Sequence, residues 1–543
     1  MKSLLLYILF VPYFLFSQSE IKGVVMGLNS QGEQIPLLGV NVFWFNTSVG
    51  TITSEDGTFT LPYEPVYKKL VFSYVGYQTD TLTINRPERI HHLLKPSDDL
   101  REVTVSARKK SSATSFLSSQ NISTISSKEL LKAACCNLSE SFETNPSIDV
   151  NFTDAVSGTK QIKMLGLTSP YILMTTENVP SIRGASQAYG LSFIPGTWVE
   201  SIQITKGAGS VVNGFESIAG QINAELVKPT LDDRIFVNAY GSLNGRTELN
   251  THFNTTLSER WSTGLYVHAD NRSQKFDRNN DTFLDMPLSK QLNIMNRWQY
   301  SDLQKGLISF LNVRFLTDEK QSGQLDFDPE TDRLSNTIWG SEITTKRFEV
   351  SSKLGYVNPE VPYQSLGFQF SYSDHDQASY FGLNQYDIRH KSVYSNIVYN
   401  SIISDSRHKI KTGLNATYDA YKETVNSKFY SRNEQSIGGF FEYSYDNLEA
   451  LNLTVGFRVD HHNLLGTFAT PRVHVRYTPW EKSAFRVSFG RGKRSANIFA
   501  ENQKLFATSR TINIQNTGGS IYGLDPEIAW NYGVSFLKGF NLF

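Results

Sequence analysis

The chain has 543 residues, enough for more than one domain, and its 52 basic residues balance its 52 acidic residues. This balance does not indicate a nucleic-acid partner, and two cysteines in so long a chain predict no disulfide framework. No internal run reaches the roughly 18 apolar residues of a membrane helix, whereas 13% aromatic residues and many short alternating segments fit an all-β protein, either a transmembrane barrel or a soluble one.

Residues 1–18 have the pattern of a secretory signal peptide. Lys2 supplies a positive charge, and Leu4–Phe16 is an apolar run interrupted by Pro12. The run is too short to cross a bilayer, and a buried N-terminal helix is the alternative interpretation. The segment therefore predicts that the chain is exported.

Residues 19–95 are predicted to form a compact β-sandwich. Apolar and polar residues alternate along short segments, and Asp56-Gly57 is a hairpin-turn signal. The expected strands are Ile21–Val25, Leu38–Trp44, Gly50–Thr60, Leu70–Tyr74 and Tyr77–Ile84. The segment shows no catalytic constellation, and His91-His92 is interpreted as a solvated strand end, with a metal role as the alternative.

Residues 96–114 are predicted to be a linker, because charge rises there and Arg108–Ser112 is basic and polar. The linker contains a short β-branched segment with no obvious partner strand, made of Glu102, Val103, Thr104, Val105, Ser106 and Ala107. This segment is either a strand that pairs with a partner protein or an ordinary linker strand.

Residues 115–229 predict a mixed α/β domain. Ser126 and Glu129 form a capping box in front of a short helix, and strands are expected near residues 161–167 and 171–174. Cys135-Cys136 would point about 100° apart on a helix, so we interpret both as packed side chains. A vicinal disulfide or a soft-metal site is the alternative.

The second half of this domain contains a strand, a glycine corner, a small-residue turn and a second strand, within Pro195–Lys228. The glycines allow positive φ and close approach of the backbone. An unrelated β-turn-β unit is the alternative. The residues that define the pattern are Glu200, Lys206, Gly207, Asn213, Gly214, Ala219, Gly220, Ile222 and Asn223.

From Leu231 onward, apolar residues recur at every second position, which predicts strands with one apolar and one polar face. About fourteen such strands are expected between residues 234 and 538. Short turns are expected at 259–260, 301–305 and 478–482, and long loops at 271–290, 317–344 and 491–527. This asymmetry is typical of an outer-membrane barrel.

The pattern in Pro195–Lys228 resembles the plug of TonB-dependent outer-membrane receptors, although Lys206, Ala208 and Asn213 stand where that family usually has Arg, Pro and Tyr. Residues 22–77 resemble the carboxypeptidase-regulatory-like domain that precedes some plugs. The residues that carry this second resemblance are Lys22–Val25, Gly39–Val42, Thr53–Phe59 and Ser73–Tyr77. The segment Glu102–Ala107 resembles the TonB box.

These resemblances imply a mainly β chain with an N-terminal β-sandwich at 19–95, a plug at 115–229 and a transmembrane antiparallel β-barrel at 230–543. The family barrel has about 22 strands, so the resemblance implies that the barrel here is incomplete. Ending at Phe543 could also imitate the aromatic last strand of barrel proteins, but we expect a fragment.

The implied function is import of a scarce ligand, either a siderophore or another metal complex, driven by the TonB protein. The implied location is the outer membrane of a Gram-negative bacterium, in contact with its lipid, with the N-terminal domain in the periplasm. No nucleophile–base pair, zinc-ligand helix or phosphate loop indicates an enzyme. A passive porin or adhesin barrel, a secreted enzyme, and uptake of a glycan or cobalamin are the alternatives.

Three groups of residues are candidates for ligand contacts. Asp277, Asn279, Asp281 and Asp285 have the spacing of a Ca²⁺ loop, but Thr282 replaces the turn glycine, and a polar loop is the alternative. His461 and His462 could contact a metal chelate at an outer strand end. Arg491 and Arg494 belong to a segment that resembles a basic strand end of the family, and they either attract an anionic ligand or line the lumen.

Overall fold

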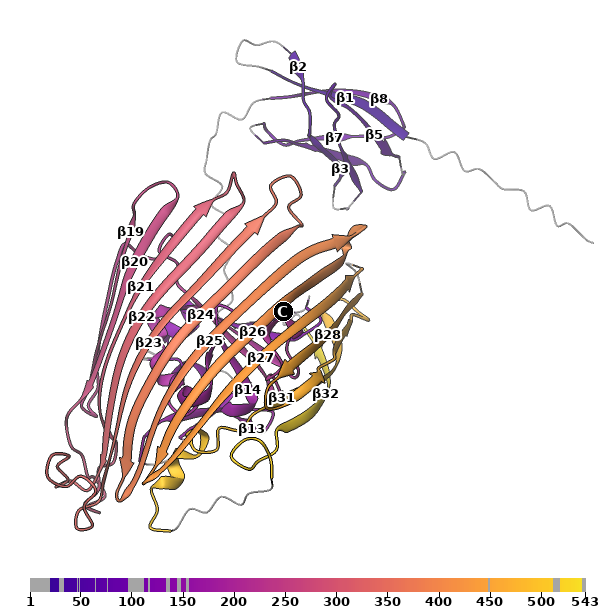
Figure 1. The fold of residues 1–543 in the computed structure, drawn as a ribbon. Helices are drawn as coiled ribbons and strands as arrows, with labels where there is room; N and C mark the ends of the chain where they lie inside the picture. The colour runs from indigo at the N-terminus through magenta and orange to yellow at the C-terminus, as the bar shows by residue number, and fades with distance from the viewer. Residues whose placement is uncertain are drawn as a thin grey trace, which may run out of the picture. The chain divides into compact units, whose positions relative to one another are not determined.

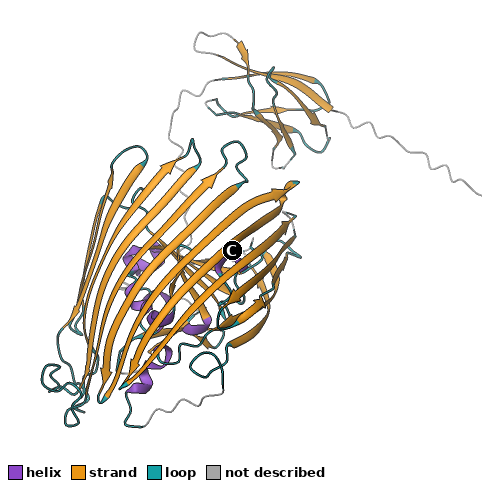
Figure 2. Ribbon diagram, viewed as in Figure 1, coloured by secondary structure: helices purple, strands orange, loops and turns teal. Residues whose placement is uncertain are grey.

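The chain divides into two compact units, Met1–Arg108 and Lys109–Phe543 (Figure 1). Strands dominate both units, and the described helices all lie in the second (Figure 2). The predicted signal peptide, the segment 102–107 and Cys135-Cys136 lie outside the described residues. The computed structural model describes residues 20–28, 34–45, 47, 49–63, 65–75, 77–95, 112–115, 118–132, 137–143, 148–152, 156–447, 450–510 and 518–539.

The first unit is a sandwich of two four-stranded sheets, which confirms the predicted fold class. Its inner faces bury Trp44, Phe59 and Phe72, and the Trp44 indole donates to the Pro62 carbonyl at 3.1 Å, so the buried N–H is satisfied. One sheet contains β2 (Gln34–Pro36), β1 (Glu20–Leu28), β5 (Thr58–Pro62) and β8 (Arg89–Leu94), and the other contains β4 (Gly50–Ile52), β3 (Asn41–Trp44), β6 (Lys69–Ser73) and β7 (Asp80–Thr83).

The turn at Asp56-Gly57 joins strands of different sheets, so the predicted hairpin is wrong. β4 pairs with β3, whereas β5 pairs with β1. The Thr58 amide and hydroxyl donate to Asp56 Oδ1 at 3.1 and 2.7 Å, and Gly57 has a φ of 75°. Where the chain crosses, the buried Thr53 hydroxyl accepts a hydrogen bond from the Val40 amide at 2.9 Å. A local Asx turn and this buried contact therefore replace the ladder of a hairpin.

We expect the first unit to lose stability as the pH falls below about 6.5, the ordinary pKa of histidine. Burial lowers the pKa of His92, which stacks on Phe72 with ring centroids 4.2 Å apart, and it outweighs the Asp80 carboxylate 3.2 Å away. The unfolded chain then binds a proton that the folded domain does not, so stability is full above that pH and declines below it.

Thermal unfolding of the full-length protein between pH 7.5 and 5.5 checks this expectation. His92→Gln should flatten the pH dependence of the first transition, by at most about 1.4 kcal/mol per pH unit. His91→Gln is the matched control, because His91 is exposed on the other face of β8. Equal pH dependence in both variants would show that His92 is not the titrating group.

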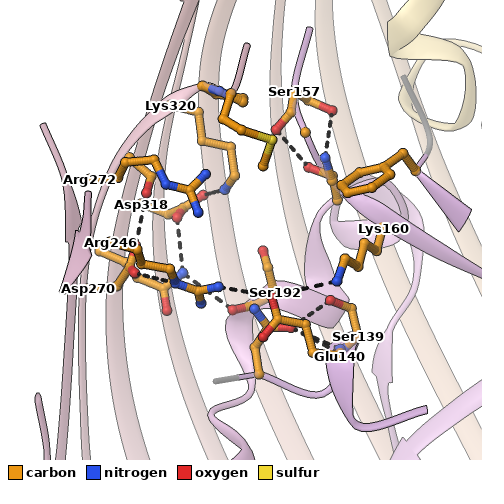
Figure 3. Close-up of a pocket in the computed structure, with 18 of the residues that line it drawn as sticks. Ser139, Glu140, Ser157, Lys160, Ser192, Arg246, Asp270, Arg272, Asp318 and Lys320 are labelled. Atoms are coloured by element: carbon orange, nitrogen blue, oxygen red, sulfur yellow. Dashed lines mark hydrogen bonds and ion pairs between the residues drawn. The ribbon is translucent and has the colours of Figure 1, made fainter. Parts of the chain in front are cut away.

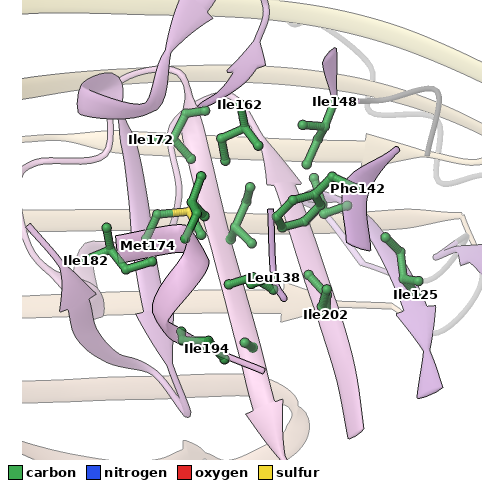
Figure 4. Packing of buried hydrophobic residues seen from close by; sticks show 14 of the residues in the cluster. Ile125, Leu138, Phe142, Ile148, Ile162, Ile172, Met174, Ile182, Ile194 and Ile202 are labelled. Carbon is green, nitrogen blue, oxygen red and sulfur yellow. The ribbon is translucent and has the colours of Figure 1, made fainter. Parts of the chain in front are cut away.

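The plug begins the second unit and contains two sheets around one core (Figure 4). Leu138, Phe142 and Ile202 meet in this core, and fully burying each such side chain contributes about 1.5–3 kcal/mol. The six-stranded sheet has the order β15 (Val179–Ile182), β14 (Ile172–Thr176), β17 (Gly220–Leu226), β16 (Val199–Lys206), β10 (Asn121–Ser126), β9 (Ser112–Thr114), and the smaller sheet contains β11 (Asp149–Phe152), β12 (Lys160–Met164) and β13 (Leu167–Thr168).

The helices of the plug are short, and the predicted capping-box region does begin a helix. They are α1 (Ser127–Lys132) and the 3₁₀ turns η1 (Glu140–Phe142), η2 (Ser169–Tyr171), η3 (Gly184–Gln187), η4 (Gly190–Phe193), η5 (Gly196–Trp198) and η6 (Val211–Asn213). A further 3₁₀ segment, η7 (Ala500–Phe506), lies in the loop before the last strand of the barrel.

The remaining strands form one curved antiparallel sheet that surrounds the plug (Figure 1). Exposed and buried residues alternate along them, as the sequence predicts, so polar side chains such as Asn250, Asn396 and Asp419 face inward. Within the described residues, the first and last strands each pair with one neighbour only.

Within the described residues, this sheet has fifteen strands. β28 pairs with both β29 and β30, which follow each other along the chain. The strands are β18 (Ile235–Gly241), β19 (Arg246–Thr256), β20 (Trp261–Arg272), β21 (Leu288–Asp302), β22 (Leu307–Gly323), β23 (Gly340–Val357), β24 (Ser365–Phe381), β25 (Asn384–Ile403), β26 (Asp405–Val425), β27 (Lys428–Asp446), β28 (Leu451–His462), β29 (Gly466–Ala469), β30 (Arg472–Tyr477), β31 (Ser483–Arg494) and β32 (Glu527–Lys538).

The two ends of the barrel differ as predicted. The connections 273–287, 324–339 and 495–526 lie at one end, which we call the long-loop end. Four short connections also occur there, at 242–245, 382–383, 426–427 and 463–465. Connections at the other end, the short-turn end, are no longer than 358–364. By the rule for outer-membrane barrels, the long-loop end corresponds to the outside and the short-turn end to the periplasm.

Within the described ranges, none of the helices combines the length and apolarity that crossing a membrane requires.

Candidate functional site

A cavity of about 240 Å³ lies between the plug and the barrel wall at the long-loop end, and we call it the outer pocket (Figure 3). Its plug side includes Ser139, Glu140 and Lys160, from the region of η1 and β12. Its barrel side is formed by the inward-facing ends of β19 to β22, with Arg246, Asp270, Arg272, Gln291, Asp318 and Lys320. A ligand in the outer pocket would therefore contact the plug and the barrel together.

Strand register arranges the barrel side of the outer pocket in two rows. The row nearer the long loops pairs Arg246 with Arg272, Arg272 with Ser289, and Ser289 with Lys320. The row beneath it runs through Glu248, Asp270, Gln291 and Asp318 in the same way. Because directly opposed residues share one face of a sheet, a cationic row lies above an acidic row.

Ion pairs connect the two rows to the plug. Arg246 Nε lies 2.9 Å from Asp270 Oδ2, and Arg246 Nη1 lies 2.9 Å from Glu140 Oε1 of the plug. Lys320 pairs with Asp318. Arg272 Nε, in contrast, is buried with no hydrogen-bond partner among the described residues, and a buried donor without a partner is costly. The arrangement leaves Arg272 available to an acceptor that enters the pocket.

Arg183, just before η3 of the plug, enters a buried cluster of barrel side chains. Its Nη2 lies 3.0 Å from Asp419 Oδ2 and 3.3 Å from Glu216 Oε1, while His390 Nε2 lies 2.9 Å from Asp419 Oδ1. Burial alone would lower the pKa of Arg183, but the two carboxylates outweigh it and raise this pKa above its ordinary value. The charged guanidinium therefore joins the plug to β26.

The glycine corner of the plug lies against β28, β30 and β31. A Cβ atom added at any of three barrel glycines would lie within 2.8 Å of a plug side chain: Gly456 against Val211, Gly490 against Ala208 and Gly492 against Ile218. Arg472 donates to the carbonyls of Ser210 and Gly214 at 2.5 and 3.0 Å. The glycines thus let the plug approach these strands closely, and the buried Arg472 holds its backbone there through hydrogen bonds.

The residues of the predicted plug pattern come together in β16, β17 and the turn between them. Lys206 pairs with Gly220, and Ile222 is buried in the plug core with Ala219. Gly207 and Gly214 have φ values of 83° and 113°, which explains why the sequence has glycine there.

Two polar residues of the same pattern make structural contacts. Asn223 Oδ1 accepts hydrogen bonds from the Asn178 amide at 2.7 Å and the Thr175 hydroxyl at 2.9 Å. Glu200 Oε2 lies 3.1 Å from Lys228 Nζ. Asn213 ends η6 and lines a second cavity, on the short-turn side of the plug.

Three family models match the chain in succession. A CarboxypepD_reg-like domain matches residues 21–105, a TonB-dependent Receptor Plug Domain matches 116–221, and the model described as TonB dependent receptor-like, beta-barrel matches 227–543. The chain belongs to the TonB-dependent receptor family. Members of this family are transporters rather than enzymes.

One curated relative of the receptor is TonB-dependent receptor P39 of Formosa agariphila, with 26% identity over 228 residues. The match covers 40% of this chain and 20% of that relative, so the chain spans about a fifth of its length.

Solved structures share the fold at low identity. The siderophore receptor PirA of Acinetobacter baumannii has 13% identity and a TM-score of 0.59, with 76% of this chain and 68% of that chain covered. P. aeruginosa FpvA, solved with pyoverdines, has 12% identity and a TM-score of 0.61, covering 78% and 61%. The alcaligin outer-membrane receptor FauA of Bordetella pertussis has 13% identity and a TM-score of 0.58, covering 77% and 67%.

In the receptor, the loop predicted to bind Ca²⁺ uses its carboxylates to hold its own backbone. Asp277 accepts from the amides of Asp281 and Thr282 at 3.1 and 2.9 Å, and Asp285 accepts from the Arg278 amide at 3.1 Å. Asn279 donates to Asp281 at 2.9 Å. The described residues contain no group of three or more His, Cys, Asp or Glu side chains placed to hold a metal ion, and Ca²⁺ binding stays a prediction.

The other two candidate groups do not form joint sites. His461 is exposed and His462 is buried, 3.5 Å from Glu434, because consecutive strand residues face opposite sides. Arg491 donates to the Ala469 carbonyl at 3.0 Å, whereas Arg494 faces the plug and donates to the Pro170 carbonyl at 2.7 Å. Of the four, Arg494 and His462 combine burial with a plug contact, because the His462 ring meets that of Phe215 with centroids 6.3 Å apart.

The sequence interpretation missed the groups that matter most in the receptor, namely the cationic row and the Arg183 cluster. Inward-facing charges at alternate positions, such as Asp419 and Glu423, were a usable signal, since an outer barrel face excludes them. No sequence signal marks Arg183 or the alignment of Arg246, Arg272 and Lys320, because strand register decides both.

Proposed function

We propose that the receptor imports a small extracellular ligand across the outer membrane of a Gram-negative bacterium, with energy from the TonB protein. The observation that carries this proposal is the outer pocket, which plug and barrel build together. A ligand that competes for Arg246 would weaken the Arg246–Glu140 contact and so act on the plug directly. A plug tied to the wall by buried ion pairs also disfavours a passive pore.

An anionic metal chelate, of the siderophore kind, suits the outer pocket best. Arg246, Arg272 and Lys320 form its outer row, and arginine and lysine are the side chains that bind clustered anionic oxygens. The solved structures of similar fold include siderophore receptors, which is consistent with this class of ligand. A neutral glycan or cobalamin has no need of such a row.

Removing Arg272 and Lys320 should weaken ligand binding. Unlike Arg246, Lys320 pairs with a barrel carboxylate rather than with Glu140, although its ammonium lies 5.6 Å from the ring centroid of Tyr189 in the plug. We expect Arg272→Gln with Lys320→Gln to raise the dissociation constant of an anionic ferric catecholate chelate by about tenfold or more. Equilibrium titration of the purified receptor at low and high salt measures the dissociation constant. Its dependence on salt concentration should be weaker in the double variant, because two positive charges are missing.

The matched control is Lys346→Gln, because Lys346 is exposed on the outer face of β23 near the same end. Equal weakening by the control, or unchanged binding in the double variant, would contradict the outer pocket as the chelate site. Preference of the unmodified receptor for a neutral oligosaccharide or cobalamin would replace the proposed ligand class. Energised uptake by cells, compared with cells that lack the receptor, tests the import itself.

A further inference from the structure

A second cavity, of about 520 Å³, lies between the plug sheet and the barrel wall at the short-turn end, and we call it the inner cavity. It is walled by the plug strands β10, β16 and β17 and by the ends of β22 to β26. The plug sheet therefore stands between it and the long-loop end, and the inner cavity is separate from the outer pocket.

Amide side chains are the main polar groups of the inner cavity. Six of them are Gln203, Asn213, Gln221 and Asn223 of the plug and Gln369 and Asn400 of the barrel. Asn223 is engaged within the plug, Gln369 Oε1 accepts from Asn396 at 3.1 Å, and Asn400 Nδ2 donates to Ser365 at 3.1 Å. The plug amides Gln203, Asn213 and Gln221 therefore carry the argument, and their N–H donors and C=O acceptors match hydroxyl and carbonyl oxygens rather than a bare metal ion. Lys353 and Lys411 add positive charge, which disfavours a cationic occupant.

One patch of the barrel wall opposite the plug amides is formed by two neighbouring glycines. Gly355 of β23 and Gly367 of β24 are directly paired, and their neighbours in the same row are Ile308 and Val398. This patch is thus apolar, with the polar Lys353 and Gln369 beside it on the wall and the plug amides opposite. A ligand with an apolar face and a rim of oxygen atoms fits between the patch and the plug amides.

Neither glycine is required by the fold. A Cβ atom on Gly355 would meet only the Ile308 carbonyl at 3.7 Å, and one on Gly367 only the Val398 carbonyl at 3.8 Å, both ordinary contacts. Neither has a positive φ. In the same row, Gly413 differs, because its Cβ would lie 1.9 Å from the Ile397 carbonyl. Glycine inside a strand is less stable than alanine, so this pair keeps space open at a cost in stability.

We propose that the inner cavity is a second ligand site, which holds an oxygen-rich small molecule with several hydroxyl or carbonyl groups after it has passed the plug. The proposal rests on the import function proposed above and adds a site on the periplasmic side of the plug. Amides of the plug bind the oxygen atoms, and the Gly355–Gly367 patch accepts the apolar face.

Filling the bare patch tests the proposal. The double variant Gly355→Val with Gly367→Val places branched side chains, which strands favour, into the cavity without a clash at Cβ. Gly439→Val is the matched control: its Cβ would lie 3.6 Å from Leu414, and it faces outward on β27. Gly355→Ala with Gly367→Ala serves if the valine pair fails to assemble, and it should give a smaller effect in the same direction.

The purified full-length receptor is titrated with two uncharged probes, maltotriose as a polyhydroxylated ligand and ferrichrome as a ferric hydroxamate chelate rich in carbonyl oxygens. We expect one probe to bind, with a dissociation constant raised about tenfold or more by the valine pair and unchanged by Gly439→Val. Which probe responds identifies the source of the oxygen atoms. The proposal is overturned if neither probe binds, or if the valine pair leaves the dissociation constant unchanged.

Energised uptake in cells tests the import function separately. If cells carrying the unmodified receptor accumulate no ferric chelate, the import function is contradicted, and the titration still decides whether the inner cavity binds ligand. If uptake occurs and titration shows no effect of the valine pair, the inner cavity is not a ligand site and the import function stands.

Discussion

Arg183→Met should loosen the plug from the barrel and destabilise the receptor by about 3–5 kcal/mol, the range found when one partner of a buried ion pair is removed. Asp419, with a side chain 1% exposed, would keep its hydrogen bonds with His390 and Ser392 but would lose the positive charge of Arg183. Removing the counter-charge of a buried carboxylate costs far more free energy than removing it from a carboxylate in water. Methionine fills a similar volume, so the effect reports charge rather than packing.

Thermal unfolding of the purified receptor and the permeability of cells to a large antibiotic measure the two consequences. Arg407→Met is the matched control, because Arg407 pairs with Asp405 on the surface, where both side chains are at least 40% exposed and solvent screens the interaction. Arg183→Met with Asp419→Asn should recover part of the loss, since the stranded charge is gone. A loss no larger than that of Arg407→Met would mean that the cluster does not hold the plug.

Much of this architecture could be predicted from short-range pattern. Two-residue alternation predicted the barrel strands and their inward faces, and the difference in loop lengths predicted the two ends. Glycines at 207 and 214 predicted tight turns with positive φ, which the φ values of 83° and 113° confirm. These features depend on residues close together in the chain, and local steric rules are enough to read them.

The candidate sites depended on register and could not be predicted in the same way. Arg183 and Asp419 are joined only because β26 presents Asp419 at the height of η3, and a shift of one residue would turn Asp419 outward. The glycines of β23, β24 and β31 look alike in the sequence. Gly490 makes room for Ala208 of the plug, whereas Gly355 faces a cavity, and only the three-dimensional packing distinguishes them.

Adjacent acidic or histidine residues are ambiguous in sequence for a related reason. Asp277 and Asp281 have metal-like spacing, yet the same spacing lets short carboxylates accept hydrogen bonds from nearby amides. His461 and His462 are neighbours in the chain but lie on opposite faces of β28. Proximity in sequence is a poor guide to a shared site in a strand.

Val103→Pro or Val105→Pro should abolish energised uptake while ligand binding survives. The segment Glu102–Ala107 precedes the plug, and we predict that it pairs with a strand of the TonB protein. Main-chain hydrogen bonds between the two strands would hold this pairing together. Work must come from a partner, because a lumen closed by ion-paired contacts such as Arg183–Asp419 does not open without it. Proline removes one N–H donor and restricts the residue before it, a loss of about 1–3 kcal/mol in pairing.

Paired measurements of surface binding and accumulated ligand separate this role from a structural one. The outer pocket lies at the long-loop end, so binding there should match the unmodified receptor, whereas uptake should fall about tenfold or more. Val103→Ala and Val105→Ala keep the N–H and should lose less, because the grip is in the main chain. Ser97→Pro, in the same linker but outside the segment, should leave uptake intact. Normal uptake in both valine-to-proline variants would refute the assignment, and loss of binding in them would show that the segment supports the fold instead.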